Sequence, residues 1–159
     1  MDIVNEKDEV IGKATEEEMY EKKLTHRIVH VFVFNDKGEL ALQLRSKCMS
    51  MCPNHWSPSA SGHVRSGESY HEAALRESKE EIGKKLEMEF LFKDVYKKDN
   101  LKKILVTFKT VYNGPFKINP KEVEKIGFFS LNKIKKMIDA GKKFHPELLF
   151  LLRRHFGFK

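Results

Sequence analysis

The segment from Gly62 to Gly83, GHVRSGESYHEAALRESKEEIG, constrains the fold of this chain more than any other part of the sequence. Ser69 and Glu72 have the S-x-x-E spacing of a capping box, in which two side chains satisfy free backbone amides at a helix start. Gly83 suits the end of the helix, because glycine readily adopts the left-handed conformation found there. The spacing therefore predicts a helix over residues 70–82.

Four acidic side chains belong to this predicted helix or to its entrance. Glu77, Glu80 and Glu81 stand at i, i+3 and i+4 and share one helix face, and Glu68 lies just before the helix start. Like charges held together are unfavourable unless a cation compensates them, and carboxylate oxygens suit Mg²⁺ or Mn²⁺. The arrangement indicates a divalent-metal site. The alternative is a solvated face with i, i+4 ion pairs, namely Glu72 with Arg76, Glu80 with Lys84 and Glu81 with Lys85.

The whole segment follows the order G-x5-E-x7-R-E-x-x-E-E-x-G. At a typical usage of about 7% per residue, seven such fixed positions coincide on the order of once in 10⁸ starting points. The segment resembles the Nudix box, which implies an α/β Nudix fold, an α/β/α sandwich with a mixed β-sheet. The two remaining positions of the box prefer bulky apolar residues, but Ser78 and Lys84 stand there. Ser78 is expected to weaken the packing of the helix on the sheet.

The resemblance also implies roles for single residues. It implies hydrolysis of a diphosphate joined to another group X, with Mg²⁺ or Mn²⁺ as the cofactor that activates the attacking water. Arg76 would keep the carboxylates ionised and fix their rotamers. The implied metal ligands are Glu68, Glu77, Glu80, Glu81 and a main-chain carbonyl near Ser61 and Gly62. The general base varies in this superfamily, and the candidates are Glu77, Glu80 and, in a loop, Glu122.

Outside the box, the stretches DEVIGKAT, HRIVHVFVFNDKGELALQLRS and WSPSASGHV resemble the branch that contains type I isopentenyl-diphosphate isomerase. That enzyme uses a cysteine where Ser61 stands here, and a hydroxyl does not supply thiol chemistry. It also uses a glutamate in a later strand, whereas residues 101–113 contain no carboxylate. We therefore expect hydrolase activity rather than isomerase activity. His26 and His63 match metal-binding histidines of the isomerase, and they form either a second metal site or ordinary hydrogen bonds.

Further candidates concern the substrate. Arg45 and Arg65 are candidate phosphate contacts, because a guanidinium fork matches phosphate oxygens, although both are also compatible with ordinary surface arginines. His63 is a third candidate contact. Trp56 either stacks on a base or packs over its loop. His30 is expected to lie in the core or the sheet.

The rest of the chain predicts one mixed α/β domain over residues 1–159, with more strands than helices. Residues 1–25 form a small N-terminal hairpin and a lead-in segment, and residues 46–69 form a long loop in which functional residues are expected. The predicted strands span 27–34, 40–44, 88–92, 104–112 and 126–129, and two further helices span 131–140 and 146–156.

Composition limits the compartment and the ligands. Cys48 and Cys52 are the only cysteines, which predicts free thiols in a reducing compartment; a zinc site with His55 is the alternative. No window is apolar enough for a membrane helix and the acidic first residues lack signal-peptide features, so a cytoplasmic protein is expected. The formal charge of +7 favours anionic ligands such as nucleotides, diphosphates or RNA.

These observations predict a divalent-metal-dependent hydrolase that cleaves a diphosphate linkage in a nucleoside diphosphate derivative, a small-molecule substrate. The first alternative is a module with the same fold that binds a nucleotide or RNA without cleaving it, suggested by the basic segments KKDNLKK, LNKIKK and GKK. The second is residual isomerase-like activity. Family analogy adds a homodimer as a possible assembly.

Overall fold

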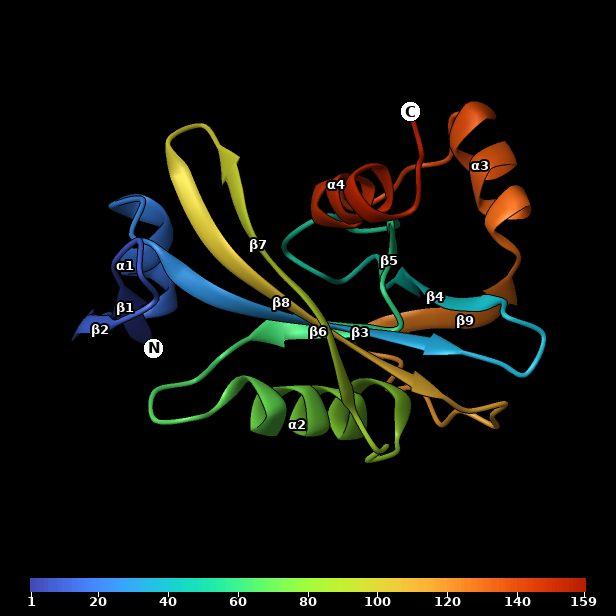
Figure 1. Cartoon of the computed structure of the whole chain (residues 1–159), viewed down its shortest axis with the longest axis horizontal. Helices are drawn as coiled ribbons and strands as arrows, with labels where there is room; N and C mark the ends of the chain where they lie inside the picture. The colour runs from blue at the N-terminus through green and yellow to red at the C-terminus, as the bar shows by residue number, and fades with distance from the viewer.

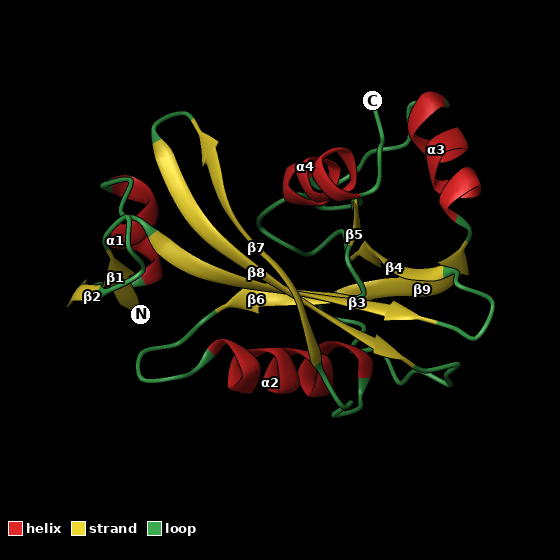
Figure 2. Cartoon of the chain, viewed as in Figure 1, coloured by secondary structure: helices red, strands yellow, loops and turns green.

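A mixed β-sheet with helices on both faces forms the centre of the molecule (Figures 1 and 2). The computed structural model describes all of residues 1–159. Helix α2 (Tyr70–Ile82) covers one face of the sheet, and α3 (Leu131–Asp139) and α4 (Pro146–His155) cover the other. The expected α/β/α sandwich is therefore confirmed. No helix is long and apolar enough to cross a membrane.

The sheet has seven strands, in the order β5-β4-β3-β8-β7, with β6 paired to β3 and β9 paired to β4. Strands β3 and β8 run parallel, and the other pairs are antiparallel. The strands span His26–Phe34 (β3), Leu40–Arg45 (β4), Trp56–Ser57 (β5), Ala60–His63 (β6), Glu89–Lys98 (β7), Leu101–Val111 (β8) and Val123–Phe129 (β9).

Strand β3 divides the core into two layers, because successive side chains of a strand point to opposite faces. Val29 and Val31 pack toward α2, and Ile28 and Phe32 pack toward α4. Burial on both faces explains why the sequence of β3 is an almost continuous apolar run. His30 lies in the middle of this strand and is buried, as expected for a sheet residue.

Before the sheet, β1 (Asp2–Val4) and β2 (Val10–Lys13) form an antiparallel hairpin, as the two short apolar pairs of this segment predict. A short helix that was not predicted, α1 (Glu16–Glu21), follows the hairpin. It begins with a complete capping box, in which the Thr15 hydroxyl accepts from the Glu18 amide and the Glu18 carboxylate accepts from the Thr15 amide. The T-x-x-E spacing was present in the sequence as a signal for this helix.

Two boundary predictions were wrong. The segment 46–69 is not a continuous loop, because it contains β5 and β6. The strands predicted at 88–92 and 104–112 extend toward each other, and their turn lies at Asp99 and Asn100, which have φ angles of 52° and 66°. The polar stretch YKKDNLKK therefore belongs mostly to strands. Its lysines are tolerated because the end of this hairpin projects beyond the core, so that Lys97 and Lys98 are exposed.

Helix α2 has the predicted limits. Both capping-box hydrogen bonds form at Ser69, and Gly83 ends the helix with a φ of 81°. Ser78 is completely buried against the sheet, and its hydroxyl has no hydrogen-bond partner. The burial confirms that this position faces the core, and an unsatisfied hydroxyl there is less favourable than an apolar side chain.

Candidate active site

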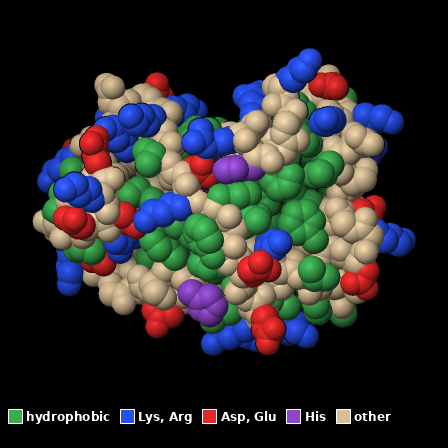
Figure 3. All heavy atoms as spheres, in the orientation of Figure 1, with side chains coloured by type: hydrophobic (Ala, Val, Ile, Leu, Met, Phe, Trp, Pro, Cys, Tyr) green, Lys and Arg blue, Asp and Glu red, His purple; other side chains and the backbone are tan.

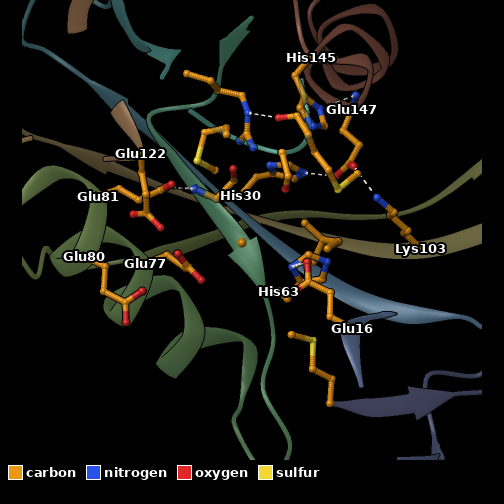
Figure 4. Close-up of a pocket in the computed structure, with 18 of the residues that line it drawn as sticks. Glu16, His30, His63, Glu77, Glu80, Glu81, Lys103, Glu122, His145 and Glu147 are labelled. Carbon is orange, nitrogen blue, oxygen red and sulfur yellow. Dashed lines mark hydrogen bonds and ion pairs between the residues drawn. The ribbon is translucent and has the colours of Figure 1, made fainter. Parts of the chain in front are cut away.

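One cavity of about 300 Å³ brings together α1, α2, β3, β6, β8 and the start of α4 (Figure 4). Ten of the residues that line it form two groups, and the labelled members of these groups lie on different sides of β6 in the view of Figure 4. We call the first group the carboxylate wall, and it consists of Glu77, Glu80, Glu81 and Glu122. We call the second group the polar wall, and it consists of Tyr20, His30, His63, Lys103, His145 and Glu147.

Arg76 connects the glutamates of the predicted box. Its Nε and Nη2 donate to the two carboxylate oxygens of Glu68, at 2.7 and 2.9 Å. Its Nη1 donates to Glu77 at 2.7 Å and to Glu80 at 3.3 Å, and its Nη2 also donates to the carbonyl oxygen of His63. The hydrogen bonds from Arg76 lower the pKa of Glu68. Arg76 therefore contacts three of the four box carboxylates, those of Glu68, Glu77 and Glu80.

Glu77 and Glu81 are the buried members of the carboxylate wall. Glu77 is 8% exposed, and burial raises its pKa to about 7, an effect that Glu80 and Glu122 strengthen and Arg76 only partly offsets. Burial also raises the pKa of Glu81 well above its usual range, and the nearby charge of Glu77 adds to this. Burying these acids is costly without a compensating cation.

Strands β4 and β6 lie close to these two carboxylates. The Ser61 amide donates to Glu81 Oε1 at 2.8 Å, and Gln43 Nε2 donates to the same oxygen at 3.2 Å. Gly62 leaves room for Glu77, because a Cβ at this position would overlap the Glu77 carboxylate. The glycine that opens the sequence pattern is thus required by the close approach of Glu77.

The acids do not form a preformed metal cage, since no three His, Cys, Asp or Glu side chains are placed to hold an ion. Two of the acids, Glu77 and Glu80, are instead joined through Arg76. The donor set nevertheless fits Mg²⁺ or Mn²⁺: it consists of carboxylate oxygens, two of the acids are buried at high cost, and Glu122 Oε2 is buried without a partner. Arg76 donates to only one oxygen of each carboxylate, Glu77 Oε1 and Glu80 Oε2, so each keeps a second oxygen for an ion.

The polar wall contains a buried ionic network. Glu147, at the start of α4, accepts from Lys103 Nζ at 3.0 Å and contacts His30 Nε2 at 3.0 Å. Burial alone would raise the pKa of Glu147, but His30 and Lys103 outweigh it and hold the pKa well below its usual range. Burial lowers the pKa of Lys103, but Glu147 and Tyr20 together outweigh burial, so the pKa is raised above its usual value. Both directions indicate a charged pair.

The two histidines considered for a second metal site lie beside this pair. The rings of His26 and His63 are stacked with centroids 5.5 Å apart, and Tyr20 Oη hydrogen-bonds to His63 Nε2 at 2.7 Å. Burial lowers the pKa of each histidine to about 4, and the charge of Lys103 contributes to both shifts. A buried ammonium next to the two imidazoles disfavours a second cation there.

The other predicted site residues are placed as follows. Arg45 and Arg65 both line the cavity; Arg45 donates to the Met51 carbonyl at 3.1 Å, and Arg65 lies 3.7 Å from Glu80. Ser61 and Glu122 also line it. Trp56 does not: its ring packs against Phe129 with centroids 5.3 Å apart.

Sequence reasoning missed most of the polar wall. Tyr20 lies on the unpredicted helix α1, and its capping box was the available signal. Lys103 belongs to the polar stretch YKKDNLKK, which was expected to connect two strands, and no pattern in the sequence singled out Glu147, so neither carried a sign of burial. Cys48 and Cys52 are free thiols in the loop beside the cavity.

Comparisons with known proteins point to one family. A family model for the NUDIX domain matches residues 24–152. The uncharacterized Nudix hydrolase YfcD of Escherichia coli K12 is 30% identical over 154 residues, which cover 94% of this chain and 82% of that protein. An uncharacterized Nudix hydrolase of Yersinia pestis is 29% identical over 127 residues, covering 79% and 70% of the two chains.

Solved structures give the same result. The crystal structure of DR0079 from Deinococcus radiodurans has a TM-score of 0.84 and 28% identity, and covers 96% of each chain. A MutT protein from Methanosarcina mazei Go1 has a TM-score of 0.64 and 25% identity, covering 71% of this chain and 82% of that one. None of these four proteins is named as an isomerase, so the resemblance to the isomerase branch gains no support from them. The chain belongs to the Nudix hydrolase family.

Proposed function

We propose that this protein hydrolyses a diphosphate linkage in a nucleoside diphosphate derivative with Mg²⁺ or Mn²⁺. The observation that carries the proposal is the carboxylate wall, in which buried Glu77 and Glu81 face one cavity together with Glu80 and Glu122. A wall of this charge would repel a diphosphate unless cations lie between them. The family relationship supports a pyrophosphohydrolase, and the nucleoside part is our inference from the sequence.

The proposed metal ligands are Glu68, Glu77, Glu80, Glu81 and the Ser61 main-chain carbonyl. When bound, the ions would lower the pKa of the attacking water and neutralise charge on the phosphoryl oxygens. Arg76 orients the carboxylates before binding, through the contacts described above. Arg45 and Arg65 line the same cavity and offer guanidinium groups to the phosphates.

The hydrolysis also needs an acceptor for the proton of the attacking water. Glu77 and Glu80 remain candidates for this general base. Glu122 is the third candidate, because its Oε2 has no hydrogen-bond partner and the residue lines the cavity from the loop before β9. Trp56 is left out of the proposed contacts because it does not reach the cavity.

The decisive experiment measures phosphate and nucleotide release from a panel of nucleoside diphosphate derivatives with Mg²⁺ or Mn²⁺. Glu80→Gln keeps the size of the side chain but removes a charge, and we expect kcat to fall at least about 100-fold. Glu124→Gln, an exposed acid on β9 outside the cavity, is the matched control and should retain full activity. Equal turnover by the wild type and Glu80→Gln would reject the proposal.

A second candidate is a module that binds a diphosphate ligand without cleaving it. It is favoured by one observation, that Arg76 forms ion pairs with Glu68, Glu77 and Glu80 and that no three candidate ligands are placed to hold an ion. Tight binding of a nucleoside diphosphate without release of product in any metal would support it. Binding of RNA has less support, because Lys and Arg side chains are dispersed among acidic ones on the face shown in Figure 3.

A further inference from the structure

We infer that the polar wall is the subsite for the X group, and that X is an uncharged, hydroxyl-bearing, non-aromatic group such as a sugar. The inference rests on the proposed function, since it assigns the part of the substrate beyond the cleaved diphosphate. The residues that we assign to this subsite are Tyr20, Lys103 and Glu147, with Glu16 at the edge of the cavity.

Part of the subsite comes from a segment outside the family match. The NUDIX match begins at residue 24, but Met1, Glu16 and Tyr20 line the cavity. The N-terminal hairpin holds this segment in place, since the amino group of Met1 donates to the Ala14 carbonyl at 2.7 Å. Residues that are not part of the shared domain thus complete the cavity, and such residues are suited to select the substrate rather than to perform the common chemistry.

The wall offers no free aromatic face for a nucleobase. Tyr20 is the only Tyr, Trp or Phe that lines the cavity. The rings of His26 and His63 pack edge-on against its ring at centroid distances of 5.3 and 5.8 Å, and Lys103 Nζ lies over the ring at 5.1 Å. A base bound here would find no free aromatic ring to stack on, and stacking is a main source of affinity for bases.

The charges of the wall also disfavour an anionic X group. Lys103 is the only fully charged cation among the assigned residues, and Glu147 neutralises it. Glu16, whose side chain is 55% exposed, adds a negative charge. A phosphate or carboxylate on X would therefore meet no unpaired cation among the assigned residues, because Lys103 is already paired with Glu147.

The hydrogen-bonding groups of the wall match hydroxyls. Lys103 Nζ has three N–H donors and gives one to Glu147, while Tyr20 Oη has its one observed bond to His63. Glu16 has no hydrogen bond and lies 4.0 Å from His63, so its oxygens are free to accept. Donors and acceptors thus lie side by side, and a hydroxyl satisfies both because it donates and accepts.

A structural role alone does not account for these groups. A buried ion pair such as Lys103 with Glu147 is often less stabilising than apolar residues of the same volume. Here the pair lines a cavity beside the carboxylate wall, rather than the closed interior of either core layer. The pair therefore lies where a polar ligand in the cavity would form hydrogen bonds with it.

The test compares two substrates with the same nucleoside, one with a hexose as X and one with a second nucleoside as X, in Mg²⁺. We expect the wild type to prefer the hexose compound by at least about 10-fold in kcat/KM. Tyr20→Phe removes only the hydroxyl and should raise KM for the hexose compound about 10-fold with kcat nearly unchanged, because the lost contact is far from the bond that breaks. A general loss of structure would instead lower kcat for both.

Tyr112→Phe is the matched control. It loses a comparable hydrogen bond, from Tyr112 Oη to the Pro115 carbonyl at 2.7 Å, but lies outside the cavity and should change neither constant. Glu16→Gln serves as a second variant, because its exposed side chain should not affect folding, and it should also raise KM for the hexose compound. Equal use of both substrates, or identical kinetics of wild type and Tyr20→Phe, would overturn the inference.

A binding measurement separates this inference from the proposed function. A hexose compound in which a methylene group replaces the bridging oxygen of the diphosphate can be titrated calorimetrically in Mg²⁺ without turnover. If no substrate is hydrolysed, the proposed function fails. The subsite would still stand, as part of a binding module, if Tyr20→Phe weakens binding of the analogue about 10-fold. Hydrolysis without any effect of Tyr20→Phe on this binding would leave the function and reject the subsite.

Discussion

Gly62 lies in β6 directly beside the carboxylate of Glu77. A Cβ added at this position would overlap the carboxylate oxygens, so Gly62→Ala must displace Glu77 from its place in the cavity. Misplacement of a functional group by about 1 Å typically costs on the order of 100-fold in rate. We therefore expect Gly62→Ala to lower kcat about 100-fold, measured on whichever substrate the wild type hydrolyses best.

The control for this prediction is Gly12→Ala in β2, where nothing lies within 4 Å of an added Cβ. This variant should keep both its activity and its thermal midpoint. If Gly62→Ala were as active as the wild type, the position of Glu77 would be irrelevant to the reaction.

At the same scale, the sequence predicted the box residues and their common face, because helix geometry alone brings i, i+3 and i+4 together. The resemblance also implied Arg76 as their partner, and Arg76 does pair with Glu80. The alternative ion pairs of Glu80 with Lys84 and Glu81 with Lys85 do not form. The sequence did not predict that Glu81 is buried and accepts from β6. Burial depends on the sheet that covers the helix, and a local pattern does not contain that information.

Among the elements, α4 is fixed to the sheet by the ionic network of Glu147. Glu147→Gln would leave Lys103 buried without a counter-charge, and breaking a buried pair in this way typically costs about 3–5 kcal/mol. We expect this loss in the free energy of unfolding measured by urea denaturation at pH 7. The double variant Glu147→Gln with Lys103→Met should recover much of it, since no unpaired charge then remains.

The same network predicts a dependence on pH. The folded-state pKa of Glu147 lies below its usual value of 4.5, so its contribution is complete above pH 4.5 and is lost as the pH falls toward the folded value. The difference in unfolding free energy between wild type and Glu147→Gln should therefore be largest near neutral pH and shrink below pH 4.5. A constant difference from pH 7 to pH 3 would contradict the assignment of a charged pair.

Helices and strands were predicted correctly where residues close in sequence determine their limits. They were missed where pairing with distant strands determines them. The caps of α2 and the glycines after α2 and α3 gave accurate helix limits. Strands β5 and β6 were hidden in a segment rich in proline and glycine, and they form only because β3 and β4 provide edges for pairing. The same applies to the polar ends of β7 and β8, which stabilise each other through the hairpin ladder.

For the molecule as a whole, net charge gives a misleading picture of the site. The chain carries a formal charge of +7, but the carboxylate wall concentrates four acids in one cavity. Positive charge on the rest of the surface draws anions toward the molecule, and under the proposed function metal ions would offset the acids of the cavity.

Cation binding should therefore stabilise the entire fold, because the ions bind the native carboxylate wall and not the unfolded chain. A ligand at 100 times its Kd adds about 2.7 kcal/mol, which for a chain of this length corresponds to a rise of about 5–10 °C in Tm. We expect this rise with Mn²⁺ or Mg²⁺ in the wild type and in Glu124→Gln, and a much smaller one in Glu80→Gln. The measurement is thermal unfolding over a metal titration at constant ionic strength, with Na⁺ as the reference. An equal shift in all three proteins would place the bound cations elsewhere on the surface and remove the carboxylate wall from the proposed mechanism.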